Sequence, residues 1–384
     1  MDINRIPFYQ YNTIIVGTGA AGLNAAVTLH KLGQKNIALI TEGRYMGTSR
    51  NTGSDKQTYY KMTQCGSEPD SVRKMAKTLF EGGCVDGDIA MAEAAGSLRA
   101  FYHLVDIGVP FPFNKSGEYV GYNKTDHDPL KRGISAGPLT SKYMTECLER
   151  QAEERGIPFF DGYQAVRLLT EEKDGEKRAA GIIALNKQKA ASPDERYAVF
   201  SAVNIIWATG GEAGMYQASV YPVSQTGGMG VLLEAGAVAK NLTESQFGIA
   251  SVKHRWNLSG TFQQCLPRYL SAEQDGSHER EFLNDYFDTP RQLLTAIFLK
   301  GYQWPFDPRK VEGQGSSLID LLVYQETVLK GRRVFLDFMH NPSPLMEGGN
   351  VSFRYLAGEA REYLENSRAL LDTPYERLKY MNPL

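Results

Sequence analysis

A short glycine-rich segment near the N-terminus limits what this chain can fold into more than any other feature. Residues 17–22 read Gly-Thr-Gly-Ala-Ala-Gly. The apolar run 13–16 before this segment predicts a buried strand, and the stretch 23–32 after it predicts a helix. A second apolar run, 37–41, predicts a second strand. The order of strand, glycine loop, helix and strand indicates a βαβ unit, and such a unit implies a parallel sheet.

The spacing of these glycines suits the binding of a dinucleotide. Gly17 permits a tight turn, Gly19 lets the backbone approach a pyrophosphate, and Gly22 lets the helix pack closely on the strand. The start of the helix offers free N–H groups and a partial positive charge to the phosphates. Glu42 lies about 20 residues further on, where an acid accepts the ribose hydroxyl protons and disfavours a 2′-phosphate. The segment therefore predicts a site for NAD or FAD rather than NADP.

Two further features favour FAD over NAD. The second strand runs through Glu42 and Gly43 into a loop rich in Ser, Thr and Gly, which is an arrangement typical of flavoproteins. Far along the chain, a buried strand at 204–208 runs into Ala-Thr-Gly-Gly at 208–211, where small residues let a loop pass close to a bound dinucleotide. No second strand–GxGxxG–helix unit follows, which argues against a separate NAD(P)H site.

Composition argues against several other classes of protein. The chain has 384 residues, of which 42% are hydrophobic and 22% are charged, as in ordinary globular proteins. The net charge of -2 gives no reason to expect nucleic acid as a partner. No apolar run approaches the roughly 18 residues of a membrane span, and the N-terminus lacks a secretory signal. Because the four cysteines form no CxxC pair and the histidines lack the spacing of a zinc site, we expect reduced thiols, no metal and a cytoplasmic location.

The rhythm of strands and helices changes along the chain. Residues 1–243 fit an α/β domain with a parallel central sheet and a helical and loop insertion at about 55–160. Aromatic, proline and charged residues mix without βαβ rhythm over 244–365, and we interpret this part as an α+β capping lobe. Residues 366–384 are expected to be a tail that leads to a C-terminal part beyond this chain. The further elements expected in the first domain are strands at 165–170, 179–185 and 197–203 and helices at 139–155 and 231–239.

With these segments in order, the chain resembles the flavoprotein subunits of fumarate reductases and succinate dehydrogenases. This superfamily also includes L-aspartate oxidase, urocanate reductase and adenylylsulfate reductase. The resemblance covers roughly residues 10–60 and 160–250 at the level of motifs. It implies FAD bound by a Rossmann-like domain, with a capping lobe that closes over the flavin ring. It also implies an FAD-dependent oxidoreductase in which a hydride passes through flavin N5.

The resemblance carries cofactor contacts over to individual positions. Covalent members carry a flavin-linking histidine in the loop that corresponds to 47–54, and this loop has none, so FAD is expected to be non-covalent. The expected cofactor-binding residues are Gly17, Gly19, Ala20, Ala21, Gly22, Glu42, Gly43, Gly47, Thr48, Ser49, Asn51, Gly53, Ala165, Ala208, Thr209, Gly210 and Gly211.

Other positions depart from the superfamily's pattern. A Thr-Gly-Asp-Gly loop is replaced by Thr-Gly-Gly-Met-Gly at 226–230, and Gly248 stands where dicarboxylate-handling members carry a substrate histidine. The small-molecule substrate is therefore left unassigned. His254, Arg255 and Arg268 are the candidate catalytic residues, because a cationic cluster could hold an anionic group of the substrate. The alternative is that these three residues form ordinary ion pairs and hydrogen bonds of the second lobe.

Two alternative functions stay open beside the oxidoreductase. The chain could be an electron-transfer subunit that docks to an iron–sulfur or haem partner protein, and its activity would then require that partner. It could also be a non-catalytic dinucleotide-binding fragment. A colourless protein that takes up neither FAD nor NAD would favour this last alternative.

Overall fold

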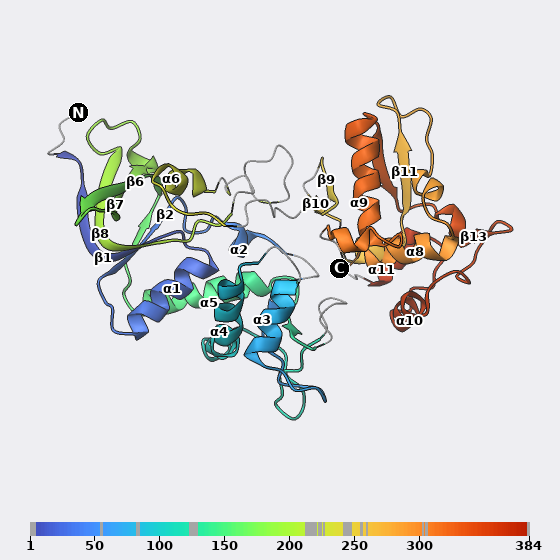
Figure 1. Ribbon diagram of the computed structural model, residues 1–384, viewed down its shortest axis with the longest axis horizontal. Helices are drawn as coiled ribbons and strands as arrows, with labels where there is room; N and C mark the ends of the chain where they lie inside the picture. The colour runs from blue at the N-terminus through green and yellow to red at the C-terminus, as the bar shows by residue number, and fades with distance from the viewer. Residues whose placement is uncertain are drawn as a thin grey trace. The chain divides into compact units, whose positions relative to one another are not determined.

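In a computed structural model, the chain forms two units, Met1–Thr243 and Glu244–Leu384, and a six-stranded sheet is the centre of the first (Figure 1). Each unit has a hydrophobic core of its own. The structure describes residues 5–53, 57–81, 85–122, 130–211, 221, 225, 227–240, 248–253, 256–258, 260–301, 303 and 306–381.

The sheet of the first unit is mixed, with the strand order β5-β2-β1-β8-β7-β6. The four neighbouring strands β5, β2, β1 and β8 are parallel, which confirms the predicted parallel arrangement. β7 runs antiparallel to β8, and β6 runs antiparallel to β7, so the chain adds a meander at one edge. The runs 197–203 and 204–208, expected as two strands, largely form the single strand β8. The strands are β1 (Phe8–Val16), β2 (Ile37–Thr41), β5 (Phe159–Asp161), β6 (Tyr163–Lys173), β7 (Glu176–Asn186) and β8 (Tyr197–Trp207).

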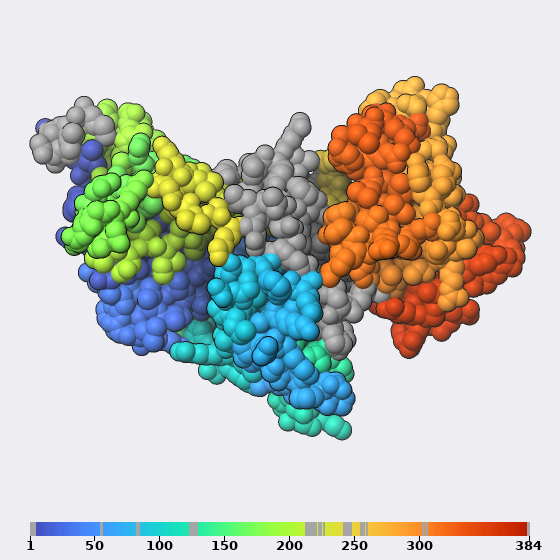
Figure 2. Space-filling view, in the orientation of Figure 1, coloured from blue at the N-terminus to red at the C-terminus, as the bar shows by residue number. Residues whose placement is uncertain are grey.

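Both faces of the parallel strands are covered at their carboxyl-terminal halves, which explains why residues 14–16 of β1 and 37–40 of β2 are apolar without alternation. On one face, Ile15 and Leu39 belong to a core that includes residues of helices α1 (Ala20–Lys31), α4 (Gly87–Asp106) and α5 (Thr140–Glu154). On the other face, Ile14 and Ile40 pack with Phe200 and other residues of the meander. In Figure 2 the N-terminal segment, in blue, lies against the green segment that contains the meander.

The remaining elements of the first unit are short or belong to the predicted insertion. They are α2 (Thr48–Asn51), β3 (Tyr59–Tyr60), α3 (Val72–Glu81), β4 (Gly133–Ile134), the 3-10 turn η2 (Lys187–Lys189) and α6 (Met229–Glu234). The helix expected at 231–239 is shorter than predicted. It ends because Gly236 adopts a φ of 94°, which reverses the chain direction in a way that favours glycine.

The second unit is built from short helices around small antiparallel pairs. One apolar core includes Phe282, Leu294 and Ile319. Strands β11 (Arg268–Ala272) and β12 (Arg333–Asp337) form an antiparallel pair, and Tyr269 and Leu336 of this pair pack in the same core. The other elements are β9 (Ala250–Ser251), β10 (Trp256–Asn257), α7 (Thr261–Gln264), η4 (Phe282–Asp285), α8 (Pro290–Leu299), η5 (Pro308–Lys310), α9 (Ser316–Tyr324), η6 (Gln325–Leu329), η7 (Ser343–Leu345), β13 (Met346–Glu347), β14 (Asn350–Val351), α10 (Gly358–Asn366) and α11 (Pro374–Met381).

Residues 366–381, the described part of the segment expected as a tail, belong to this second unit. Arg377 of α11 is fully buried. Its Nε donates to the Cys265 carbonyl at 2.8 Å, and its two terminal nitrogens donate to the Leu371 carbonyl at 2.7 Å and to Asn341 Oδ1 at 2.6 Å. These bonds satisfy a buried guanidinium and attach the helix to the unit. Within the described residues, none of the helices has the length and apolar character needed to cross a membrane.

Candidate cofactor site

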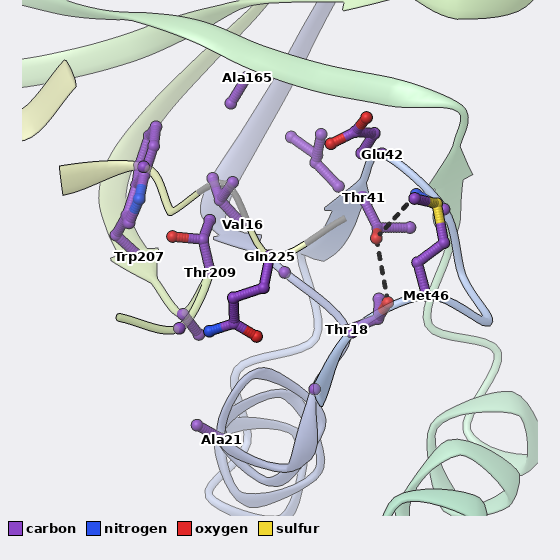
Figure 3. Close-up of a pocket in the computed structure, with 18 of the residues that line it drawn as sticks. Val16, Thr18, Ala21, Thr41, Glu42, Met46, Ala165, Trp207, Thr209 and Gln225 are labelled. Carbon is purple, nitrogen blue, oxygen red and sulfur yellow. Dashed lines mark hydrogen bonds between the residues drawn. The ribbon is translucent and has the colours of Figure 1, made fainter. Parts of the chain in front are cut away.

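Segments that are distant in the sequence meet at one cavity of ≈ 260 Å³ in the first unit (Figure 3). The glycine loop after β1, the loop after β2, the end of β8 and the start of β6 all line it. β1, β2 and β8 are parallel neighbours, so their carboxyl ends lie along one edge of the sheet. Ligands of open α/β sheets bind at this edge.

Most of the predicted cofactor residues lie in the wall of this cavity. They come from four separate stretches of sequence, which only the folded sheet brings together. These lining residues are Gly17, Gly19, Ala20, Ala21, Glu42, Gly43, Gly47, Thr48, Ser49, Ala165, Ala208, Thr209 and Gly210.

Four predicted residues do not line the cavity. Gly22 lies beneath the loop, and a Cβ added there would stand 2.0 Å from the Gly17 carbonyl oxygen. Asn51 Nδ2 donates to the carbonyl oxygens of residues 45 and 47, at 2.8 and 3.0 Å, so its side chain stabilises its own loop. Gly53 lies against the side chain of residue 139, and Gly211 follows the lining segment.

The glycine loop is held in a conformation that only glycine adopts easily. Gly17 has a φ of 107°, and a Cβ there would stand 2.4 Å from the Ala208 carbonyl oxygen. The Gly17 N–H donates to the Ile40 carbonyl at 2.8 Å, and the Ala208 N–H donates to the Val16 carbonyl at 2.7 Å. These contacts join the loop to both neighbouring strands.

The N-terminus of α1 is directed at the cavity without a neutralising acid. Its N-cap residue is Gly19, which offers no side-chain cap, and the first turn carries no acidic residue. The Ala20 N–H donates to Ser49 Oγ at 3.3 Å. The partial positive charge at this helix end suits a phosphate group.

Glu42 stands at the end of β2 on the cavity wall, and it has a cationic partner that the sequence did not predict. Lys187 Nζ donates to Glu42 Oε1 at 2.7 Å, with 29% of the Glu42 side chain exposed. Lys187 begins the turn after β7, so the pair depends on a fold that brings this turn to the end of β2. The ion pair with Lys187 orients the Glu42 carboxylate, and Glu42 still lines the cavity.

Trp207 and Thr209 form the opposite side of the cavity from Glu42 (Figure 3). Trp207 Nε1 and Thr209 Oγ1 are buried, and neither has a hydrogen-bond partner within the described part of the chain. Gly228 packs directly on them, since a Cβ there would stand 2.7 Å from Trp207 Nε1 and 2.9 Å from Thr209 Oγ1. The sequence reading missed Trp207 because an apolar residue at a strand end has no distinctive pattern. From the sequence, Gly228 stands out only as a departure from the superfamily's aspartate.

This packing leads to a prediction for Gly228→Asp. The substitution restores the residue type that the superfamily carries, yet we expect it to lower the free energy of unfolding by about 1–3 kcal/mol, because the indole already occupies the space. Urea denaturation of the first unit measures the change. Gly230→Asp is the matched control, because a Cβ at Gly230 meets no atom of the described residues within 4 Å apart from the backbone of its own helix. Equal stability of the two variants would contradict the steric explanation, and Trp207→Ala should relieve the effect of Gly228→Asp.

Of the three candidate catalytic residues in the second lobe, the structure describes only Arg268. Arg268 opens β11, and its guanidinium is surrounded by carboxylates: Nε donates to Glu281 Oε1 at 2.7 Å, while Nη1 lies 3.7 Å from Asp337 Oδ2 and 3.8 Å from Glu279 Oε1. An arginine that is engaged in this way acts as a structural ion-pair partner within its unit. His254 and Arg255 lie outside the described residues.

Comparison with known proteins shows what the chain is similar to. The sequence profile of a family described as FAD binding domain matches residues 12–267, about two thirds of the chain. The L-aspartate oxidase of Agrobacterium fabrum is 27% identical over 242 residues, which are 61% of this chain and 42% of that protein. The L-aspartate oxidase of Pseudomonas aeruginosa is 28% identical over 263 residues, which are 64% of this chain and 46% of that protein. The chain thus spans less than half the length of these curated relatives.

Solved structures show the same fold. A quinol-fumarate reductase with menaquinol molecules superposes with a TM-score of 0.58 at 16% identity, over 98% of this chain and 70% of that one. A flavocytochrome c3 fumarate reductase in an open conformation superposes with a TM-score of 0.56 at 18% identity, over 70% of this chain and 48% of that one. The predicted resemblance to these flavoproteins is confirmed. Since the family profile spans the glycine loop, Glu42 and the rest of the cavity wall, the chain belongs to the FAD binding domain family.

Proposed function

We propose that this chain is an FAD-dependent oxidoreductase, or the FAD-binding part of one, that exchanges a hydride with a small molecule. The observation that carries the proposal is the convergence of the glycine loop, the acidic end of β2 and the small-residue end of β8 on one cavity. When bound, FAD supplies the hydride chemistry at flavin N5, and the protein contributes binding, orientation and charge.

The residues of the cavity fit the parts of FAD that bear charge and hydroxyl groups. The pyrophosphate would lie on the glycine loop at the N-terminus of α1, where glycine allows close approach and the helix end attracts the negative charge. Glu42 would accept hydrogen bonds from the adenosine ribose, and the backbone at Ala165 would lie beside adenine. We propose that FAD is held non-covalently, because the described lining residues include no histidine or cysteine.

The substrate of the proposed reaction is a small molecule whose class we leave open. The relatives named above differ in substrate by their own names, and Arg268 is engaged with carboxylates. The described cysteines, Cys65, Cys147 and Cys265, are free thiols, which supports a cytoplasmic location as part of the proposal.

Release of the cofactor is the experiment that tests the proposal. The purified full chain is denatured in acid, the precipitate is removed, and the released nucleotide is identified by its absorption spectrum and mass. We expect FAD in the supernatant and no flavin on the precipitated protein. Release of NAD would refute the FAD site, and flavin retained on the protein would refute non-covalent binding. Bleaching of the flavin by a candidate substrate then tests the oxidoreductase activity.

One observation favours a second candidate function, an electron-transfer subunit. A relative from Coxiella burnetii that is 24% identical over 254 residues is named as the flavoprotein subunit of succinate dehydrogenase, and subunits of this kind work in complexes. A dye-coupled activity that appears only after an iron–sulfur or haem protein is added would favour this function. Full activity of the isolated chain would favour the first proposal.

Glu42→Ala is expected to weaken FAD binding strongly. The change removes at least one hydrogen bond from a ribose hydroxyl group to a charged acceptor, worth about 1.5–3 kcal/mol, so the dissociation constant should rise by at least roughly ten- to two-hundredfold. Titration of the apoprotein with FAD, followed by quenching of flavin fluorescence, measures it. Glu172→Ala serves as the control, because this acid is exposed on the β6–β7 hairpin away from the cavity. If the two variants bind FAD equally well, Glu42 is not the ribose ligand.

A further inference from the structure

The loop that follows β2 has one side in the cavity and another side bound to the protein. We call residues 43–51 the cofactor loop. Gly43, Met46, Gly47, Thr48 and Ser49 of this loop line the cavity. The loop also carries two arginines, at 44 and 50, which do not line it. The position of the cavity wall therefore depends on what holds these two arginines.

One carboxylate holds both arginines. Glu149 lies on α5, and the residue as a whole is only 8% exposed. Its Oε1 accepts from Arg44 Nε at 2.5 Å, and its Oε2 accepts from Arg50 Nη2. Each oxygen is thus used by a different end of the cofactor loop, so a single side chain on a core helix fixes the loop at two points.

The burial of this group distinguishes it from an ordinary surface ion pair. The side chains are 18% exposed for Arg44, 13% for Arg50 and 10% for Glu149. Pairs with little access to water are screened less by solvent and salt than exposed pairs. Removal of one charge from such a group leaves the other charges poorly compensated, which is more damaging than the loss of a surface pair.

The two arginines differ in how much they depend on Glu149. Arg44 also contacts Glu153, its guanidinium lies 4.1 Å from the Phe159 ring centroid, and its backbone N–H donates to Asp161 Oδ1 at 2.8 Å. Arg50 has a second carboxylate, Glu146, only at 3.7 Å, and its Nε is buried without a partner within the described residues. The end of the loop at Arg50 therefore relies most on Glu149.

That end of the loop is also the one that reaches the glycine loop. Ser49 precedes Arg50 and accepts a hydrogen bond from the Ala20 N–H, the first residue of α1, at 3.3 Å. Thr48 donates to Gln225 across the cavity. We propose that Glu149 is a positioning residue for FAD: it does not line the cavity, but it sets the place of Thr48 and Ser49 beside the pyrophosphate site. This inference rests on the proposed FAD site.

The test compares Glu149→Gln with Glu153→Gln in the full chain. Both changes remove one acid of α5 that contacts Arg44, but Glu153 is half exposed and does not contact Arg50 within hydrogen-bonding range. We expect Glu149→Gln to raise the FAD dissociation constant at least about tenfold and to speed amide exchange of residues 44–51 in the apoprotein. Glu153→Gln should stay within about twofold of the wild type in both measurements.

Arg50→Gln provides a second route if Glu149→Gln does not fold. Arg50→Gln removes the partner of Glu149 on the cofactor loop, and we expect it to weaken FAD binding about as much as Glu149→Gln does. The double variant Glu149→Gln/Arg50→Gln should bind FAD little more weakly than either single variant. Unchanged exchange of residues 44–51 in Glu149→Gln or Arg50→Gln would overturn the anchoring of the loop. Faster amide exchange of residues 44–51 with unchanged FAD affinity would overturn the role of Glu149 in positioning FAD.

The two proposals fail in different ways. If the wild-type chain takes up no FAD, the proposed function fails, and with it the role of Glu149 in positioning FAD. Amide exchange of residues 44–51 in the wild type and the variants still tests the anchoring of the cofactor loop independently of FAD. If the wild type binds FAD while Glu149→Gln binds it equally well, only the inference about Glu149 fails.

Discussion

Gly22→Ala is expected to abolish FAD uptake and to destabilise the first unit by about 3 kcal/mol or more. The added Cβ would stand 2.0 Å from the Gly17 carbonyl oxygen and 3.4 Å from the Ala208 side chain. Neither neighbour can give way easily, since Gly17 belongs to the backbone of the loop and is bound to β2 through its N–H. The helix would have to move away from β1, and the N-terminus of α1 would then leave its place at the cavity.

Gly96→Ala is the matched control for this substitution. Gly96 is exposed within α4, and apart from the backbone of its own helix a Cβ there meets no atom of the described residues within 4 Å. Alanine should therefore stabilise the unit by roughly 0.5–1 kcal/mol through its better helix propensity. Urea denaturation and FAD titration of both variants measure the two effects. Normal FAD affinity in Gly22→Ala would show that the helix and strand do not need this close contact.

Arg132→Met is expected to lower the free energy of unfolding of the first unit by about 3–5 kcal/mol at neutral pH, because it leaves a buried carboxylate without its partner. Arg132 and Asp70 have side chains only 1% and 2% exposed. Arg132 Nη2 donates to Asp70 Oδ1 at 2.7 Å, and Nε donates to Oδ2 at 2.9 Å. Nη1 donates to Thr78 Oγ1 at 2.9 Å. The pair joins the loop before α3 to the residue that precedes β4.

The pH dependence of this effect follows from the pKa of Asp70. Burial opposes ionisation of this carboxyl group, but the hydrogen bonds from Arg132 and from backbone N–H groups outweigh it and lower the pKa below 3.8. The group therefore contributes stability that is present above its unfolded pKa and is lost as pH falls through the lower, folded value. Without Arg132, burial would raise the pKa of Asp70. The difference between wild type and Arg132→Met should thus begin to shrink above about pH 4, where the raised pKa lets the carboxyl group of the variant take up its proton. It should shrink further as pH falls through the lowered pKa of Asp70 in the wild type.

An exposed pair provides the comparison for Arg132→Met. Arg178 Nη2 lies 3.2 Å from Glu176 Oε2, and both side chains are largely exposed. Arg178→Met should change the stability by less than about 1 kcal/mol. Urea denaturation between pH 3 and pH 7, with amide exchange of residues 57–81 to identify the first unit, measures both variants. Equal losses in the two variants would mean that burial of the Arg132 pair does not matter.

The sequence by itself was sufficient for the parts of the site that depend on local chemistry. A strand that runs into Gly17 and a helix that follows Gly19 need glycine because of the backbone conformation and the space available, and both requirements are visible in a short stretch of chain. The position of Glu42 follows from the same βαβ unit, since the length of the helix and the return strand determines where the strand ends. These residues could be predicted because they lie close to one another in sequence.

Residues whose role depends on distant partners could not be predicted in this way. The sequence suggests Arg268 as a candidate for binding an anion. In the fold, its guanidinium is paired with the carboxylates of Asp337 in β12 and Glu281 before η4. Lys187 reaches Glu42 only because the fold brings the turn after β7 to the end of β2. Trp207 and Gly228 meet across 21 residues of chain, and neither residue type reveals the contact.

The cofactor loop shows the division most clearly. Its composition identified it as a functional loop near the dinucleotide, because small polar residues allow a backbone to approach a ligand. Composition says nothing of what holds such a loop in place. Only the tertiary structure decided that Glu149, about 100 residues further along the chain, contacts Arg44 and Arg50 together. The physical reason is that glycines and helix ends act through the local backbone, whereas a buried charge acts through whichever opposite charges the folded chain brings within a few ångströms of it.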